Sequence, residues 1–219
     1  MPKMNKKQEQ RLASTERILQ CALDLFVKNG YRATTVDTIA GDVGMTKGAV
    51  YFYFENKTAI MLRLLDQAEA IVVDPVVKRI EGIDATAIEK LVAFLNYVSM
   101  IALQHPQHRL LLILTSIEFY GSNTDIEVRV RSIYRRLYSC VEHFIHQGQV
   151  QGTIRADIRS HELTSIVMAY FDGTLIEWHR RPGELDGKSL TLAARSTLLD
   201  GIRAKPHSAL AVTDIAGSH

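Results

Sequence analysis

The stretch that decides the fold runs from Thr34 to Lys57 and reads TTVDTIAGDVGMTKGAVYFYFENK. Thr35 and Thr46 each precede a short segment with apolar residues at helical spacing, and a threonine hydroxyl is a good cap for the first turn of a helix. Gly44 stands between the two segments, and glycine readily adopts the positive φ that a tight turn needs. The stretch therefore predicts two short helices joined by a tight turn.

The residues before this stretch predict a further helix, from Ser14 to Asn29. Ser14 can cap its start, and its apolar residues recur at the spacing of one buried stripe. Asn29 and Gly30 together supply a C-terminal stop. Three short helices in about 45 residues are the usual content of a helix-turn-helix domain.

After residue 57 the predicted helices are longer. They are expected at residues 57–73, 85–104, 109–120, 125–147, 160–179 and 189–203. Pro75 should break or kink the chain after the first of them. No segment alternates polar and apolar residues for long enough to predict a strand. We therefore predict an all-α fold.

Two domains and a tail follow from this pattern. A small domain with a basic arm and the helix-turn-helix is predicted at residues 1–57, and a larger helical domain at 58–204. The residues from 205 to 219 show no periodicity, so we expect a disordered tail. The basic excess lies at the other end, because residues 1–17 carry five basic and two acidic side chains. We expect this arm to precede the first helix and to follow a nucleic-acid duplex.

The composition excludes several classes of protein. The 219 residues are 47% hydrophobic and 23% charged, which is typical of a soluble globular protein and excludes a disordered or collagen-like chain. The longest apolar runs fall short of the roughly 20 residues that span a bilayer, so we expect no membrane partner. Cys21 and Cys140 cannot form a disulfide framework, which favours the reducing cytoplasm.

No sequence motif predicts catalysis. A glycine-rich phosphate loop, a serine nucleophile elbow and a zinc-protease motif are all missing from the sequence, so we do not expect an enzyme. His105 with His108, and His143 with His146, have a spacing that can fit a metal on a helix, but neither pair has a cysteine or carboxylate nearby as a third ligand. We predict no metal site and no cofactor.

The second helix of the helix-turn-helix has an outer side suited to DNA. Its N-terminal end carries Thr46 and Lys47 beside unpaired N–H groups, and Tyr51 lies four residues after Lys47. A helix N-terminus, a hydroxyl, a lysine and a phenol fit phosphate oxygens and base edges of the major groove. Gly48 allows close approach of the backbone, and Ala49 can place a methyl against a thymine methyl.

Residues 12 to 60 resemble the DNA-binding domain of the tetracycline-repressor (TetR) family. The shared pattern comprises Thr34/Thr35, Ile39-Ala40, Gly44, Thr46, Gly48, Tyr51-Phe52-Tyr53-Phe54 and Lys57. Val43, Met45 and Thr46 are small departures that remove no type of contact. The other interpretation of Tyr51 to Phe54 is an aromatic core patch of a helical hairpin.

The resemblance implies a role for each residue of the motif. As phosphate contacts it implies Thr35, Thr46, Tyr51, Tyr53 and Lys57. As the base-reading end of the recognition helix it implies Lys47, Gly48 and Ala49. Phe52 could serve either role or pack on sugar.

The resemblance also implies a second helical domain that binds a small molecule and dimerises. The last two helices of such a domain form a four-helix bundle with those of the partner chain. The predicted helix at 160–179 has more apolar surface than one core needs, which favours an interface. The expected interface residues are Tyr170, Phe171, Leu175 and Leu198.

A candidate effector pocket lies among the middle helices. Its predicted lining is Phe94, Tyr97, Met100, Ile101, Leu114, Ile117, Glu118, Tyr134, Leu137, Tyr138 and Trp178. Aromatic and methionine side chains suit a flat or elongated apolar ligand, although each of them could equally be a plain core residue. Glu118 could meet a cationic ligand group or pair internally with Arg129 or Arg135.

The sequence thus predicts a dimeric, ligand-responsive repressor. It would leave a palindromic operator when a small, largely apolar or aromatic molecule binds the second domain, with the helix from Lys57 as the lever. The alternative is a helical adaptor or ligand-binding protein that does not bind DNA.

Overall fold

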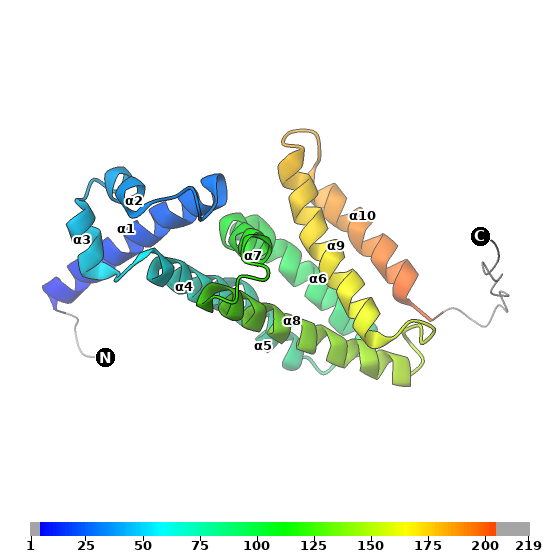
Figure 1. Cartoon of the computed structure of the whole chain (residues 1–219). Coiled ribbons are helices and arrows are strands. Elements are labelled where there is room, and N and C mark those ends of the chain that lie inside the picture. Colours follow the sequence, from blue (N-terminus) through cyan, green and yellow to red (C-terminus); the bar gives the residue numbers. More distant parts are fainter. Residues whose placement is uncertain (1–4, 205–219) are drawn as a thin grey trace, which may run out of the picture.

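The computed structural model describes residues 5–204, and within them the all-α prediction is confirmed. The helices are α1 Lys6–Asn29, α2 Val36–Asp42, α3 Lys47–Tyr53, α4 Lys57–Ala68, η1 Glu69–Val73, α5 Asp74–Glu81, α6 Ala87–Gln104, α7 Pro106–Glu118, α8 Asp125–Val150, α9 Ser160–Arg180 and α10 Gly187–Ile202. The β-structure of this part is one isolated bridge, Ile154 to Arg203. In Figure 1, α1–α3 form one end of the molecule, and the paired α9 and α10 lie toward the other. The predicted tail at 205–219 lies outside the described residues.

Helix α1 starts earlier than predicted. Asn5 caps it through a capping box with Gln8, so the helix begins at Lys6 rather than at Ser14. The apolar stripe that suggested Ser14 begins only at Ile18, because the first turns of α1 are exposed and polar. The expectation of an extended arm is therefore wrong for Lys6, Lys7 and Arg11, which lie on α1, while Lys3 lies outside the described residues.

The predicted tight turn joins α2 and α3. Gly44 has a φ of +68° there, in the left-handed region that favours glycine. Thr35 accepts a hydrogen bond from the Thr38 N–H, and Thr46 accepts one from the Ala49 N–H, so both predicted caps are confirmed. Ile39 and Val50 are fully buried in the core that the two short helices share with α1.

The chain stays helical across Pro75, although it does not stay regular. Proline lacks an N–H and its ring clashes with the carbonyl four residues earlier, which forces an α-helix to break or widen. Here the turn before it widens into the π-helical η1, and α5 begins at Asp74. The predicted break is thus absorbed by one wide turn, and π-turns of this kind are often found at functional sites.

The larger half packs α6 against α5, α8 and α10, with α9 against α8. By length and composition alone α6 is long and apolar enough to cross a membrane, but here it is a core helix that buries Leu91, Phe94 and Val98. Gly148 is needed where α8 passes α6, because a Cβ there would lie 2.7 Å from the Ala87 Cβ and 2.7 Å from Ile154.

Candidate nucleic-acid interface and effector core

The N-terminal end of α3 points its polar residues outward. Thr46, Lys47 and Gly48 are exposed, while Val50 on the opposite side is fully buried. Tyr51 is 45% exposed and Phe52 is 69% exposed. These two rings are therefore not the aromatic core patch of the alternative interpretation. In this run Phe54 is buried in the core, and the half-buried Tyr53 packs against it.

Gly48 is not required by the protein's own packing. A Cβ at this position would meet nothing within 4 Å, and the residue does not lie at positive φ. Glycine in a helix interior costs about 0.5–1 kcal/mol relative to alanine. Because the fold itself does not require a glycine here, Gly48 is consistent with the close approach of another molecule to this turn of α3.

Two lysines at this surface already have partners within the chain. The Lys47 Nζ donates to Asp37 at 2.6 Å, and both side chains are more than half exposed, so the pair is open to competition by another anion. The Lys57 Nζ donates to the carbonyls of Tyr31 and Thr34 at 2.8 and 2.7 Å. Burial lowers the pKa of Lys57, and its Nζ also lies 4.1 Å from the centre of the Tyr31 ring.

The other residues that were predicted to contact DNA lie at the same end of the domain. Thr35 caps α2 and is exposed, Ala49 and Tyr53 are half-buried on α3, and the Phe52 ring lies edge-on to Tyr53. Arg11 of α1 stands 5.7 Å from the centre of the Phe52 ring. A helix N-terminus, hydroxyls and cations thus share one exposed end of the molecule, which suits a phosphate backbone.

The predicted pocket residues are not brought together. Phe94, Ile101 and Leu137 are buried core residues. Tyr97 and Met100 line an outer groove beside Arg79 and Arg203. Leu114 and Ile117 lie on the exposed face of α7, with Ile117 67% exposed, so they do not line an interior pocket.

A cavity of about 60 Å³ does lie among the helices of the larger half, between α6, α9 and α10. Of the predicted pocket residues only Trp178 lines it. Its apolar wall also includes Leu95, Val98, Phe171 and Leu175. Phe171 and Leu175, predicted as interface residues, therefore belong to this wall and to the chain's own core.

The predicted interface residues are mostly covered within the chain. Phe171, Leu175 and Leu198 are buried, and Tyr170 is half-buried. The outward face of α9 and α10 instead forms a shallow groove of small and apolar residues. The groove is lined by Ile166, Ala169, Tyr170, Gly173, Thr174, Glu177, Leu190, Ala193, Ala194 and Thr197.

Glu118 has partners other than the predicted arginines. Its carboxylate accepts hydrogen bonds from the backbone N–H groups of Tyr31 and Arg32, both at 3.0 Å. Arg129 pairs with Asp66 and Glu69 instead. Glu118 is the last residue of α7, so this helix is fastened directly to the loop between α1 and α2.

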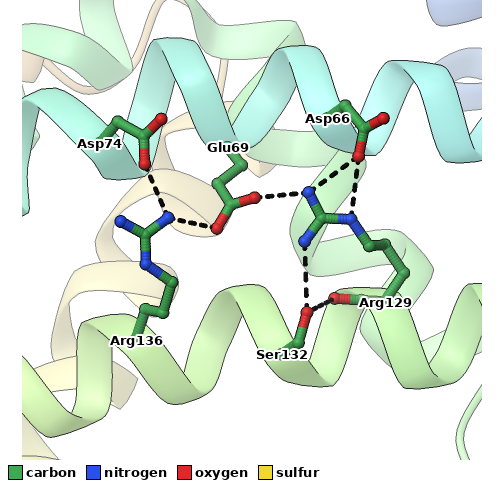
Figure 2. Close-up of polar contacts among 6 residues, drawn as sticks. All are labelled: Asp66, Glu69, Asp74, Arg129, Ser132 and Arg136. Atoms are coloured by element: carbon green, nitrogen blue, oxygen red, sulfur yellow. Dashed lines mark hydrogen bonds and ion pairs between the residues drawn. The ribbon is translucent and has the colours of Figure 1, made fainter.

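A row of ion pairs joins α4, η1 and α5 to α8 (Figure 2). Arg129 binds Asp66 and Glu69, and Arg136 binds Glu69 and Asp74. Glu69 stands between the two arginines, and although its burial acts the other way, their hydrogen bonds hold the pKa of Glu69 below its usual value. The wide turn η1 is therefore fixed to α8 by charge.

A buried charge lies behind the cavity wall. Arg109 of α7 is 0% exposed and pairs with Asp172 of α9, while Asp172 also accepts a hydrogen bond from the Tyr134 hydroxyl at 3.4 Å. Burial raises the pKa of Asp172, an effect that Arg109 opposes. Burial likewise raises the pKa of Tyr134. The sequence reasoning missed this cluster, although a lone arginine at the head of the apolar run of α7 was a visible signal.

The comparisons with known proteins agree with this arrangement. Residues 18–64 match the model of the bacterial regulatory proteins of the tetR family, and residues 66–200 match that of the C-terminal region of YsiA-like proteins. The chain belongs to the TetR family. It is a DNA-binding transcriptional regulator, as its relatives are.

Several similar proteins align with most of the chain. The crystal structure of the MbdR regulator from Azoarcus sp. CIB is 57% identical, covers 86% of this chain and 98% of its own, and has a TM-score of 0.79. The fatty acid metabolism regulator protein of Bacillus subtilis is 24% identical over 86% of this chain and 95% of its own length. A structure of FadR from Bacillus subtilis in complex with stearoyl-CoA is 22% identical, covers 85% of this chain and 98% of its own, and shares the fold with a TM-score of 0.68.

Proposed function

We propose that this regulator is a homodimeric repressor that leaves a palindromic operator when a largely apolar or aromatic small molecule binds its C-terminal domain. The exposed N-terminal end of α3, with a glycine that the fold does not need, carries the DNA-binding half of the proposal. Thr35, Thr46, Tyr51, Tyr53 and Lys57 contact phosphates. Lys47, Gly48 and Ala49 face base edges, and Phe52 packs on the backbone.

The effector site of the proposal is the cavity between α6, α9 and α10. Its wall is mainly apolar, as small-molecule sites usually are. The relatives named for fatty acid metabolism, and the FadR structure with stearoyl-CoA, support an acyl compound as one candidate effector. The cavity of about 60 Å³ is smaller than most ligand sites, so binding requires its wall to move.

Two connections carry that movement to the DNA. One is the chain itself, because α4 follows the recognition helix and is fixed to α8 by the ion pairs of Asp66 and Glu69. The other is α7, which Glu118 fastens to the loop before α2. A ligand that favours a different spacing of the two recognition helices lowers operator affinity by population shift, since the two half-sites lie about one helical turn, roughly 34–36 Å, apart.

The dimer forms through the outward face of α9 and α10. Ala169, Gly173 and Ala193 there allow close approach of two helix pairs, and Ile166 is 47% exposed on the same face. The proposed dimer interface is therefore this face, rather than the buried Phe171 and Leu175. Such a regulator acts in the cytoplasm, where its DNA lies.

The proposal is tested by selecting bound sequences from a random duplex library and measuring affinity by fluorescence anisotropy over a range of salt. We expect a two-fold symmetric site and a steep loss of affinity with salt. Tyr51→Ala should weaken specific and random duplexes alike, because phosphate contacts carry no sequence information. Lys47→Ala should instead relax base preference at one or two positions in each half-site. A helical adaptor would show no salt-dependent duplex binding, and that result would overturn the proposal.

A further inference from the structure

Arg109 is a fully buried cation whose hydrogen-bonding capacity is only partly used. Its Nη2 binds Asp172, but its Nε and Nη1 are buried without a hydrogen-bond partner among the described residues. A buried donor without a partner costs about 1–3 kcal/mol, and more for a charged group. Buried polar groups are nearly always paired, so this exception requires an explanation.

Packing alone does not provide that explanation. A methionine could fill the same volume without leaving donors unpaired, and buried ion pairs are often no more stabilising than apolar residues of similar size. The guanidinium has only N–H donors and no acceptor, so the missing partner must be an acceptor atom. Asp172 already balances the charge of Arg109, so a second carboxylate would bring an uncompensated negative charge into the interior. A neutral carbonyl oxygen fits both conditions.

The cavity lies on the other side of one aromatic side chain. The Phe171 ring stands over the guanidinium, with the Arg109 Cζ 3.4 Å from the ring centre. Phe171 also belongs to the wall of the cavity between α6, α9 and α10. A ligand that displaces this ring therefore both enlarges a small cavity and gains access to the unpaired donors.

From this geometry we infer that Arg109 recognises a neutral carbonyl oxygen on an apolar effector, such as a ketone, ester or thioester, once Phe171 moves aside. The inference rests on the proposed function, because it takes this cavity as the effector site. It adds the chemical class of the ligand and the residue that selects it. Arg109 lies on α7, the helix whose last residue, Glu118, holds the loop between α1 and α2, so the contact is made at one end of a helix that touches the DNA-binding domain at the other.

The test uses three probes of similar size: acetophenone with a neutral carbonyl, benzoate with a charged one, and ethylbenzene with none. Affinity for the purified full-length protein is measured by isothermal titration. We expect acetophenone to bind at least about tenfold more tightly than benzoate or ethylbenzene, because a hydrogen bond to a charged donor contributes about that much affinity. In Arg109→Met this preference over ethylbenzene should vanish. The Arg109 Nε–H signal in a ¹⁵N spectrum, identified by its loss in R109M, should shift with acetophenone and not with ethylbenzene.

Removing Arg109 leaves Asp172 buried without its partner, so R109M can lose stability. The double variant R109M/D172N removes both charges and serves as the folded reference, with its melting curve recorded beside the titration. Equal preference for acetophenone in the double variant and the wild type would overturn the inference, as would absence of any preference, or of any binding at millimolar probe, in the wild type. Operator binding is measured on the same samples. If the wild type binds its operator but shows no preference for acetophenone, only the inference about the carbonyl fails. If the wild type does not bind an operator, the proposed function fails.

Discussion

The two halves of this molecule differ in how far apart in sequence their decisive contacts lie. In the DNA-binding half, the hydroxyls of Thr35 and Thr46 bind N–H groups three residues away. In the larger half, Arg109 meets Asp172 across 63 positions and Arg136 meets Glu69 across 67. Local capping chemistry therefore determines the first half, whereas the second depends on which helices pack together. The contact of Glu118 with Tyr31, 87 positions apart, is one of those that join the two halves.

The largest expected effect comes from filling the space at Gly48. Gly48→Leu should abolish operator binding, with a loss of more than about a hundredfold in anisotropy titrations, because the side chain would hold α3 away from the groove. The unfolding free energy should stay the same or rise by about 0.5–1 kcal/mol, since nothing in the chain lies within 4 Å of the new Cβ. Gly201→Ala, an exposed glycine on α10 with equally open space, is the control. Retained affinity in G48L would move the DNA-reading surface elsewhere.

The difference between local and long-range contacts also explains which features could be predicted from the sequence. The turn at Gly44, both threonine caps and the outward position of Lys47 were predicted, because each depends on a few neighbouring residues. The start of α1 was misplaced, since a capping box at Asn5 extends the helix beyond its apolar stripe.

In the larger half most of the helix positions were predicted, apart from α5, but their partners were not. Periodicity shows that a residue such as Phe171 faces inward, yet it does not distinguish a residue buried within its own chain from one buried against a second copy. Glu118 was singled out correctly as unusual, but its hydrogen-bond donors are backbone N–H groups, which carry no sequence signal, and its ion-pair partner is Arg32 rather than Arg129 or Arg135.

The second largest effect concerns the outward face of α9. Gly173 lies in its shallow groove, and a Cβ there would meet nothing within 4 Å in the same chain. Gly173→Leu should therefore leave the fold intact and yield a monomer in sedimentation, because the added side chain would separate two closely packed helix pairs. Operator affinity should fall about a hundredfold, since one chain reads half of a palindromic site. A G173L protein that stays dimeric would show that the dimer interface lies on another face. Gly41→Ala, at an exposed glycine of α2 in the DNA-binding half where a Cβ would meet nothing within 4 Å, is the control.

An intermediate effect is expected where the two halves meet. Glu118→Ala removes the acceptor of two backbone N–H groups, so the unfolding free energy should fall by about 2 kcal/mol in urea titrations. The effector should also release the DNA less completely, because α7 is no longer held to the loop between α1 and α2. Glu118→Gln keeps one acceptor oxygen in place, so it should change both the unfolding free energy and the release of DNA by less than Glu118→Ala does. If E118A is as stable and as responsive as the wild type, the halves are coupled by α4 and by the packing of α7 on α1.

The smallest effect, and the most specific in its dependence on pH, belongs to the ion pairs of Figure 2. Burial would raise the pKa of Glu69, but the hydrogen bonds of Arg129 and Arg136 outweigh it and hold this pKa below its ordinary value of 4.5. A depressed folded pKa means that the unfolded chain takes up the proton first as the pH falls, so this stabilisation is complete well above pH 4.5 and is lost as the pH falls through the folded pKa.

Glu69→Gln should therefore lower the unfolding free energy by about 1 kcal/mol at pH 7, a modest value because Arg136 is half exposed. The difference from the wild type should shrink as the pH falls below 4.5, the ordinary pKa of a glutamate. Glu55→Gln, an exposed residue for which the described part of the chain shows no ion pair, should cause little change at either pH. Denaturant titrations at several pH values measure both variants. A constant difference between E69Q and the wild type across this range would mean that the carboxylate acts through its shape alone, and that the wide turn of η1 is held to α8 by packing rather than by charge.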